Sequence, residues 1–442
     1  MQRPTSTRTP KPSRPPASTR ATSQRQTASP TGSAPLSRRE PRPDRRRADL
    51  VRALATSAYI PTFLAEIGVG AMLPLLTLSV LAYDVPVAVA SLGIGVYSAG
   101  RLLTSAFVGS AVSRLGPMRA SMASLVVLAA GAGLAAAAPG LWAFLAAAAL
   151  IGAGHAALHV SRQARIDDLV ASHQRARALT TLAGLWRVAN FLGPLAGGAV
   201  IAVWGLEAGY AMAAGTIVAG MVALVFAPAW RTRHSLSASR HVPLRSVIAH
   251  TLPTLRTLGV AVVLTGALRA ARNVVIPLWG SHLGLDDHTI SYIFGLSAAV
   301  DMLLFVPAGY VMDRWGRRWT AVPSALLLAV GTSMLPFTGS PLTLAIAGVV
   351  LGLGNGWGSG VLMTLGGDAA PAEGRAEFIG VWMALQDAGG LLGPAVVSAG
   401  AAISFPVGFH LIGGMGVATA GAMARWIPPW RLTGASDPRP TA

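Results

Sequence analysis

Twelve long apolar stretches constrain this chain of 442 residues more than any other feature. An α-helix rises 1.5 Å per residue, so about 20 apolar residues cross the roughly 30 Å hydrocarbon layer of a bilayer. Only 12% of the residues are charged, about half the roughly 25% usual in soluble domains. A soluble enzyme is therefore excluded, and we expect an all-α integral membrane protein. The predicted spans are 54–82, 87–110, 119–138, 141–162, 179–203, 207–228, 256–280, 289–311, 320–337, 341–365, 377–402 and 405–427.

The connections between these spans alternate in charge. Every second connection carries arginine, whereas the connections at 83–86, 139–140, 204–206, 281–288, 338–340 and 403–404 contain no Lys or Arg. Because positively charged loops stay in the cytoplasm, we expect both termini there and a multi-pass protein of the plasma membrane. The net charge of +18 lies in the N-terminal tail and in these loops. This distribution sets topology and argues against nucleic acid as a partner.

The chain divides into five segments by composition. Residues 1–48 are rich in Arg, Pro, Ser and Thr, so we expect a disordered basic cytoplasmic tail, with a weak tether to anionic lipid as the functional alternative. The stretch 229–255 is polar and basic and is predicted to be a cytoplasmic linker. It separates a six-helix half at 49–228 from a second at 256–428, and 429–442 forms a C-terminal tail.

The two halves are copies of one unit. A shift of 200 residues superimposes special residues of the first half on the same residue types in the second. The matches are Gly109 with Gly309, Arg114 with Arg314, Gly116 with Gly316, Gly152 with Gly352, Gly154 with Gly354, Asp168 with Asp368, Arg175 with Arg375, and Gly193-Pro194 with Gly393-Pro394. Two repeated six-helix bundles imply a transporter whose site lies between the halves.

One cytoplasmic loop carries a specific signature. Gly309-Tyr-Val-Met-Asp313-Arg314-Trp-Gly316-Arg317-Arg318 follows the pattern glycine, three residues, Asp-Arg, any residue, Gly-Arg-Arg. The first-half copy runs from Gly109 through Arg114 and Gly116, with Ser113 in the acid's place. With this loop, residues 53–428 resemble the major facilitator superfamily, in which the acid helps to lock the cytoplasmic side. We expect Gly309 to allow close helix approach and Gly316 to allow the turn.

A second motif concerns the direction of transport. Gly193-Pro194-Leu-Ala-Gly197-Gly198 in the fifth span resembles the glycine-proline signature of proton-coupled antiporters, although Ala189 and Ala148 depart from the antiporter pattern. The eleventh span repeats the Gly393-Pro394 pair. Proline bends a membrane helix and glycine lets it pack closely. The resemblance implies proton-coupled efflux, and simple helix packing is the alternative.

Seven charged residues fall inside predicted spans. A charge at the bilayer centre costs at least about 2.5–3.5 kcal/mol, so such residues usually face a cavity or a partner. The repeat superimposes Arg101 on Asp301, Arg187 on Asp387 and, with a shift of 203, Glu66 on Arg269, and Arg272 lies near. We expect these residues to form charge pairs across or beside a central cavity, with the carboxylates of Glu66, Asp301 and Asp387 as proton carriers. His155 is a further candidate for proton transfer.

Weaker candidates for the substrate cavity are Asn190, Asn273, Asn355 and Gln386. The chain has no cysteine, and it has no phosphate-binding loop or HExxH pair, so we expect no cofactor and no metal. Transport would then be driven by an ion gradient, most simply of protons.

Three functions are compatible with these residues. Proton-coupled export of small organic molecules or drugs by alternating access is the first expectation. Proton symport of a sugar, metabolite or organic anion is the alternative, which the mid-membrane arginines favour. A receptor or scaffold that does not transport is the third. In each case the partners are the lipid bilayer and a small molecule, and we expect a monomer.

Overall fold

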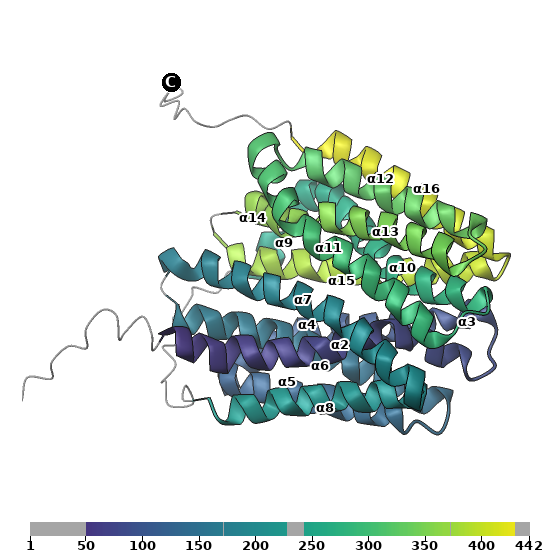
Figure 1. Ribbon diagram of the computed structural model, residues 1–442. Helices are drawn as coiled ribbons and strands as arrows, with labels where there is room; N and C mark the ends of the chain where they lie inside the picture. The colour runs from purple at the N-terminus through teal and green to yellow at the C-terminus, as the bar shows by residue number, and fades with distance from the viewer. Residues whose placement is uncertain (1–49, 171, 228–242, 372, 429–442) are drawn as a thin grey trace, which may run out of the picture.

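The computed structural model describes residues 50–170, 172–227, 243–371 and 373–428, and these form helices joined by short turns, without a strand (Figure 1). The expected all-α architecture of twelve membrane-crossing helices in two six-helix bundles is confirmed. Ten of the described helices are long and apolar enough to span a membrane by composition alone. The crossing helices α4 and α15 are the other two; they carry Arg101 and Asp387, and they pack against each other.

The N-terminal bundle begins with a helix at Leu50–Leu81 that contains a π-helical turn, Ala55–Tyr59, and α2. Its helices are α2 (Ile60–Leu81), the short α3 (Val87–Ala90), α4 (Leu92–Leu115), α5 (Pro117–Ala136), α6 (Leu141–Leu169), α7 (Ser172–Trp204) and α8 (Leu206–Val225). Figure 1 shows this bundle in purple to teal.

The C-terminal bundle repeats this plan, in green to yellow in Figure 1. Its helices are α9 (Leu244–Thr254), a π-helical turn (Leu255–Gly259), α10 (Val260–His282), α11 (Asp287–Trp315), α12 (Arg318–Met334), a 3-10 turn (Leu335–Phe337), α13 (Pro341–Trp357), α14 (Val361–Ala369), α15 (Arg375–Ala401) and α16 (Phe405–Trp426).

Equivalent glycines pack the two bundles in the same way. A Cβ atom on Gly152 would collide with the backbone of Tyr97, and one on Gly352 would collide with the backbone of Ser297, 200 residues further on. Likewise, Gly154 lies against Leu128, and Gly354 lies against Leu328. The duplication found in the sequence is therefore a duplication of helix contacts.

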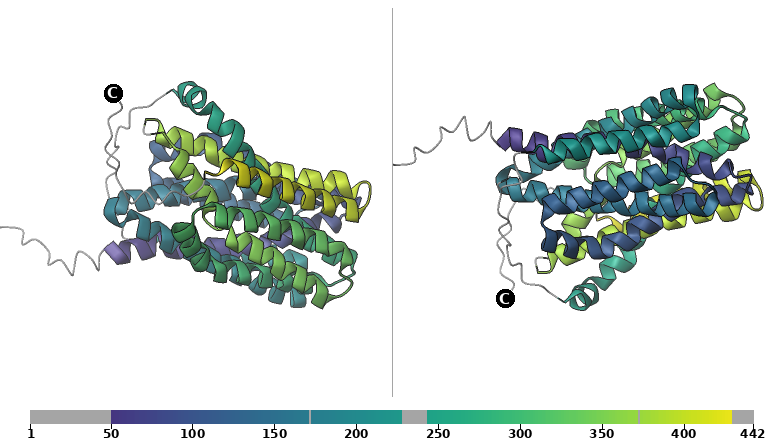
Figure 2. Two further views of the ribbon diagram at one scale, coloured as in Figure 1. Left: turned by 90° about the horizontal axis from the view of Figure 1, so that it is seen from above. Right: turned by 90° about the horizontal axis from the view of Figure 1, so that it is seen from below.

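The helices run side by side between two ends of the molecule (Figures 1 and 2). The basic end holds the turns after Leu115 and Trp315, with Arg114, Arg314 and Arg318 exposed. The neutral end holds the turns at 82–86, 137–140, 283–286 and 338–340, which have no Lys or Arg. The first and the last described helices, starting at Leu50 and ending at Trp426, both reach the basic end.

Several helices extend beyond their predicted spans at the basic end, as α6 does to Leu169, and two differ more strongly. The seventh crossing helix starts at Leu244, inside the segment predicted as linker, and runs through Pro253 to His282. The tenth is interrupted after Trp357, because Gly360 adopts a left-handed φ of 79° that ends α13 and restarts the chain as α14. The glycine run at 352–360 makes this break possible.

Candidate functional site

Glu66 is the most deeply buried acid of the N-terminal bundle, with 0% of its surface exposed. The carboxylate accepts a hydrogen bond from Nη1 of Arg162 on α6, and its Oε1 lies 3.3 Å from Nε2 of His155. Thus α6 presents both a fixed cation and a titratable group to one carboxylate of α2. A buried charge pair of this kind is stable only when further hydrogen bonds satisfy it.

His155 connects this pair to α4. Its Nδ1 lies 2.5 Å from the hydroxyl of Tyr97 and 3.2 Å from Nη1 of Arg101. A guanidinium can only donate hydrogen bonds, so Nδ1 must accept. The ring proton then sits on Nε2 and points to Glu66. The contacts thereby select the neutral tautomer with its hydrogen on Nε2.

Arg101 extends the chain of contacts into the other bundle. Its Nη2 donates to Oδ1 of Asp387 on α15 across 3.2 Å, and both side chains are largely buried. A polar chain therefore runs from Asp387 through Arg101, His155 and Glu66 to Arg162. We call these five residues the polar chain.

Asp301 has a different environment in the C-terminal bundle. Its carboxylate accepts hydrogen bonds from Nδ2 of Asn355, at 2.7 Å, and from the hydroxyl of Ser359, at 3.4 Å. Ser359 lies in the break between α13 and α14, so the break delivers a donor to the acid. Three guanidinium groups interact with Asp301 electrostatically, those of Arg187, Arg269 and Arg272.

The arginines of α10 are held by neutral groups. Nη2 of Arg269 donates across 2.6 Å to the carbonyl of Gly358, which lies in the break between α13 and α14 and also accepts from the backbone N–H of Val361 at 3.3 Å. Arg272 donates to the hydroxyl of Ser297 across 2.9 Å and lies over the ring of Phe294. Helix α10 thus keeps two positive charges inside the bundle with a single acid, Asp301, nearby.

Arg187 on α7 reaches the boundary between the bundles. The central carbon of its guanidinium lies 4.3 Å from the ring centroid of Phe305 on α11, and 5.3 Å from that of Trp186. Its Nε atom is buried without a hydrogen-bond partner. Cation–π contact stabilises the charge but leaves this donor unused.

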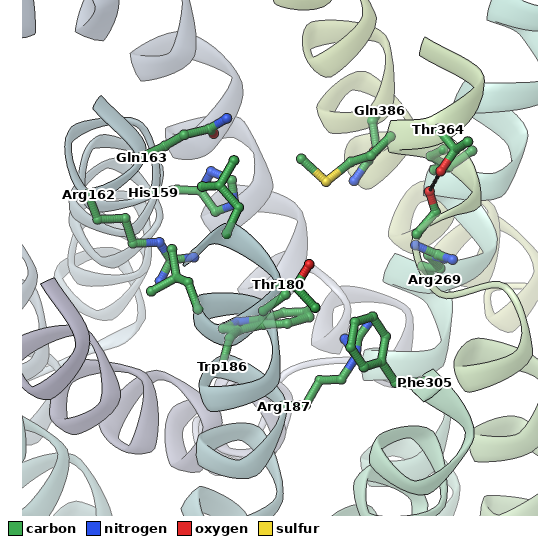
Figure 3. Close-up of a pocket in the computed structure, with 16 residues that line it drawn as sticks. His159, Arg162, Gln163, Thr180, Trp186, Arg187, Arg269, Phe305, Thr364 and Gln386 are labelled. Carbon is green, nitrogen blue, oxygen red and sulfur yellow. Dashed lines mark hydrogen bonds between the residues drawn. The ribbon is translucent and has the colours of Figure 1, made fainter. Parts of the chain in front are cut away.

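A cavity of about 400 Å³ opens between the bundles (Figure 3). On α6 it is lined by His159, Arg162 and Gln163, which lie nearer the basic end of that helix than His155 does. It receives residues from α6 and α7 of one bundle and from α10, α11, α14 and α15 of the other. Its polar lining consists of His159, Arg162, Gln163, Thr180, Arg187, Arg269, Thr364 and Gln386. Trp186, Phe305, Leu179, Leu182 and Met363 supply much of its apolar lining.

The bundles meet on the neutral side of this cavity. A Cβ atom on Gly198 of α7 would lie 2.7 Å from the ring of Tyr292 on α11, and one on Gly295 would lie 3.0 Å from Leu195. On the other flank, the hydroxyl of Ser398 on α15 donates to the carbonyl of Ala88 on α3. The structure is therefore a state that is closed at the neutral end, with its cavity toward the basic end.

The structure brings together the predicted charges but not in the pairs that the repeat suggested. Arg101 contacts Asp387 instead of Asp301, and Glu66 contacts Arg162 instead of Arg269. The reason is geometric. Residues that are equivalent by the repeat occupy equivalent places in two different bundles, and these places do not face each other. Each residue instead contacts the helix that packs against its own helix.

Arg162 is the main residue that sequence reasoning missed, because it falls at the predicted end of the fourth span. The spacing of the polar residues along α6 could have identified it. His155, His159 and Arg162 are separated by four and three residues, so they share one face of α6. The helix continues to Leu169, which places Arg162 inside it.

The weaker cavity candidates divide into two groups. Gln386 lines the cavity, and Asn355 binds Asp301. Asn190 donates to the carbonyl of Trp186 on its own helix, and Asn273 is partly buried on α10 outside the cavity lining.

The glycines of the helix-five and helix-eleven motifs serve close packing, as expected. A Cβ atom on Gly193 would lie 2.5 Å from the carbonyl oxygen of Ile67, and one on Gly393 would collide with the carbonyl of Ala267. Gly197 lies against Ala71. Pro194 lies near Gly295, and Pro394 lies near Gly95, so both motifs also border the contact between bundles.

The signature loop at the basic end departs from expectation at one point. Gly116 and Gly316 have φ angles of 81° and 96°, so they do permit the turns. The expected close approach at Gly309 is wrong for this state, because a Cβ atom there would meet nothing within 4 Å, and the same holds for Gly109. Among the described residues, no other helix packs against either glycine in this state.

The charged residues of this loop contact their own bundle. Arg317 forms an ion pair with Asp368 of α14, with Nε 2.8 Å from Oδ2. Arg314 donates to the hydroxyl of Tyr310 one turn earlier, and Asp313 is exposed. In the first half, Arg175 pairs with Asp167 at 2.8 Å.

Comparison with known proteins gives a family match and a fold match. A family model described as Major Facilitator Superfamily matches residues 58–268 and 258–440. An uncharacterized MFS-type transporter, YcaD, of Salmonella heidelberg (strain SL476) is 25% identical over 232 residues, which are 50% of this chain and 56% of that protein; a Salmonella typhi relative matches equally. The match thus spans little more than half the length of these curated relatives.

Solved structures share the fold. A POT family transporter in complex with 5-aminolevulinic acid has a TM-score of 0.69 and 12% identity, covering 85% of this chain and 95% of that one. A POT family transporter in complex with a thioalcohol-conjugated peptide has a TM-score of 0.66 and 12% identity with the same coverage. At this identity the likeness concerns the fold alone.

Proposed function

The chain belongs to the major facilitator superfamily, and we propose that it is a proton-coupled secondary transporter of small organic molecules. The single observation that carries the coupling is the polar chain. It joins the buried acid Glu66 to Asp387 in the opposite bundle through one histidine and one arginine.

Coupling follows from the chemistry of this chain of contacts. Arg101 donates to Nδ1 of His155 only while that nitrogen is unprotonated. A second proton on His155 would turn Nδ1 into a donor facing a cation. The Arg101 contact to His155 would then be lost, and the ion pair that joins α4 to α15 would be disturbed. Proton uptake and movement of the bundles would be linked through shared contacts.

Alternating access supplies the transport step. In the described state the cavity lies toward the basic end and the bundles meet at the neutral end. Rocking of one bundle against the other would expose the same residues to the other side. We place the basic end in the cytoplasm of a cell with this protein in its plasma membrane, following the positive-inside rule, and we expect the monomer to work alone.

Proton-driven export is the second candidate. The Gly193-Pro194 motif favours it, because this motif resembles the glycine-proline signature of proton-coupled antiporters, and it borders the contact between α7 and α11 at the neutral end. An exporter exchanges its substrate for protons, so the two would move in opposite directions. A symporter moves both in the same direction.

The test uses the purified full chain in proteoliposomes with an imposed pH gradient. The radiolabelled probes are benzoate, glucose and tetraphenylphosphonium, each with and without an uncoupler. We expect one probe class to accumulate against its gradient, with the uncoupler abolishing this. Glu66→Gln should keep passive exchange of that probe but lose the accumulation, whereas Glu207→Gln, an exposed acid at the neutral end, should behave as the wild type. The proposal would be refuted if every probe accumulated to the same extent with and without the pH gradient. It would also be refuted if Glu66→Gln accumulated the probe as fully as the wild type.

A further inference from the structure

The charge of the cavity identifies a substrate class. Three of its lining residues are arginines, Arg162, Arg187 and Arg269, and none is Asp or Glu. The acid nearest to Arg187 and Arg269 is Asp301, whose oxygens already accept from Asn355 and Ser359. One acid therefore faces the three guanidiniums of Arg187, Arg269 and Arg272, and the cavity carries a positive excess.

Arg187 has a buried hydrogen-bond donor that a ligand in the cavity could use. It is only 8% exposed, yet its Nε atom has no hydrogen-bond partner. A buried donor left unsatisfied is destabilising, and more so when the group is charged. Figure 3 shows its guanidinium beside Phe305, at the cavity between the two bundles. An acceptor oxygen in the cavity would satisfy this donor.

Arg269 faces the same cavity from the opposite bundle. Its Nη2 is used by the carbonyl of Gly358, while its Nε is buried without a partner. One guanidinium from α7 and one from α10 therefore border a single cavity of about 400 Å³. This volume lies within the range of small-molecule sites, and Trp186, Phe305 and Met363 offer apolar surface beside the cations.

Arg162 links this cavity to the proton. It lines the cavity and at the same time donates to Glu66. An anion in the cavity competes with the Glu66 carboxylate for this guanidinium. Uptake of a proton by the Glu66–His155 pair cancels the net negative charge of the pair, weakens its attraction for Arg162 and so makes Arg162 available to the anion. Proton and anion therefore favour each other's binding, which is the sign required for symport.

The charged and titratable groups that act directly on Glu66 both come from α6, among the several helices that pack against α2. From α6 it is faced by His155 and Arg162, with His159 nearby; α4 contributes Tyr97 and Arg101, and α15 contributes Asp387 beyond them. Helices α7 and α8 meet α2 through neutral residues, Asn190, Ala213 and Thr216.

We infer that the cavity binds an organic anion with an apolar body, held by Arg187 and Arg269 from opposite bundles and by Arg162 once the Glu66–His155 pair has taken up a proton. This inference rests on the proposed function and deepens it. The substrate enters with a proton, so its negative charge is compensated during transport.

The test is calorimetric binding to the full chain in lipid nanodiscs, at mildly acidic and mildly alkaline pH. The probes are benzoate and phenylphosphonate, with benzamide and benzylammonium as neutral and cationic matches. We expect the two anions to bind, more tightly at acidic pH, and the two matches not to bind. Arg187→Gln and Arg269→Gln should each weaken anion binding by about tenfold or more, equal to about 1.4 kcal/mol. Arg114→Gln, which removes an exposed arginine outside the cavity, should leave it unchanged.

Two further variants serve as controls for the role of charge at these positions. Arg187→Lys keeps the charge and should bind benzoate more tightly than Arg187→Gln, so the inference can be judged even if the neutral variant folds poorly. Glu66→Gln should bind benzoate tightly at both pH values. Equal binding of benzoate and benzamide, failure of the wild type to bind either anion, or tighter anion binding at alkaline pH would overturn the inference.

The binding and transport assays separate this inference from the proposed function. Proton-driven accumulation of glucose or tetraphenylphosphonium, without anion binding, would refute the substrate class and leave proton coupling intact. Anion binding that depends on Arg187 and Arg269, without accumulation of any probe under a pH gradient, would refute the coupling and leave the anion site intact.

Discussion

Arg101 of α4 and Asp387 of α15 form an ion pair between the two bundles, with Nη2 of the arginine 3.2 Å from Oδ1 of the acid. The pair lies on the neutral side of the cavity, and the same guanidinium contacts His155. It is thus the point at which the buried titratable groups of one bundle contact the other bundle. The strength of this ion pair contributes to the preference for the state that is closed at the neutral end.

Removing either partner should shift the molecule toward the state that is open at the neutral end. For Asp387→Asn we expect the ratio of the two states to change by about tenfold, which is about 1.4 kcal/mol. The chain has no cysteine, so spin labels can be attached at Trp204→Cys and Phe337→Cys, two exposed neutral-end positions in different bundles. Pulsed electron resonance should show more of the longer distance.

The double variant tests whether the two residues act as a pair. If the ion pair carries the effect, Arg101→Gln together with Asp387→Asn should shift the distances hardly more than either change alone. Fully additive shifts would mean that each residue acts through other contacts. Arg114→Gln on the same helix is the matched control, because this arginine is exposed at the basic end.

The tautomer of His155 is a second expected outcome. Arg101 and the Tyr97 hydroxyl both approach Nδ1, and Glu66 lies at Nε2, so the neutral ring should carry its proton on Nε2. Nitrogen-15 NMR of the labelled protein reports which ring nitrogen is protonated. Loss of the resonance in His155→Gln would assign it among the nine histidines.

Tyr97→Phe supplies the control for this measurement. Because Arg101 still donates to Nδ1, the same tautomer should persist in that variant. A proton on Nδ1 in the wild type would contradict the proposed route from the proton to the ion pair.

The fold was predictable from the sequence because apolar length and the 200-residue repeat are properties of the chain itself. The packing of Gly152 on Tyr97 and of Gly352 on Ser297 shows that the repeat also predicts which positions must be small. Charge pairing was less predictable. The repeat identifies equivalent places, but the contact of Arg101 with Asp387 depends on how α4 and α15 cross.

The break in the tenth crossing helix was also beyond the sequence pattern. Its apolar residues continue through 341–365, so hydropathy favours one helix, and membrane helices tolerate glycine. The contact of Arg269 shows one consequence of the break, because the guanidinium donates to the carbonyl of Gly358 inside it. Arg162 was missed because the predicted span ended at this residue, whereas the helix continues to Leu169.

Gly393 should tolerate no side chain. A Cβ atom there would collide with the carbonyl of Ala267 on α10, so Gly393→Ala must push α15 away from α10. Overpacking of this kind typically costs about 1–3 kcal/mol. We expect reversible unfolding in detergent mixtures to show a loss of that size. Gly414→Ala on α16, where a Cβ atom meets nothing within 4 Å, should show no loss, and an equal loss at both positions would mean that the collision with Ala267 is not the cause.

Gly309 should matter only in the state that the structure does not show. A Cβ atom there meets nothing within 4 Å, so Gly309→Leu should leave the described state intact. Phe305, one turn earlier on the same face of α11, already contacts Arg187 of α7. Gly309 is therefore placed to meet α7 when the basic end closes, and a leucine would obstruct that closure.

Spin labels at Leu115→Cys and Trp319→Cys, both exposed near the basic end and in different bundles, report this closure. For Gly309→Leu we expect the short-distance population to fall by about tenfold, the effect of about 1.4 kcal/mol of steric obstruction. Gly133→Leu on α5 is the matched control, because that glycine is exposed and a Cβ atom on it also meets nothing within 4 Å. The same fall in both variants would locate the effect in helix propensity, and no fall in Gly309→Leu would show that α11 does not approach α7 at this level.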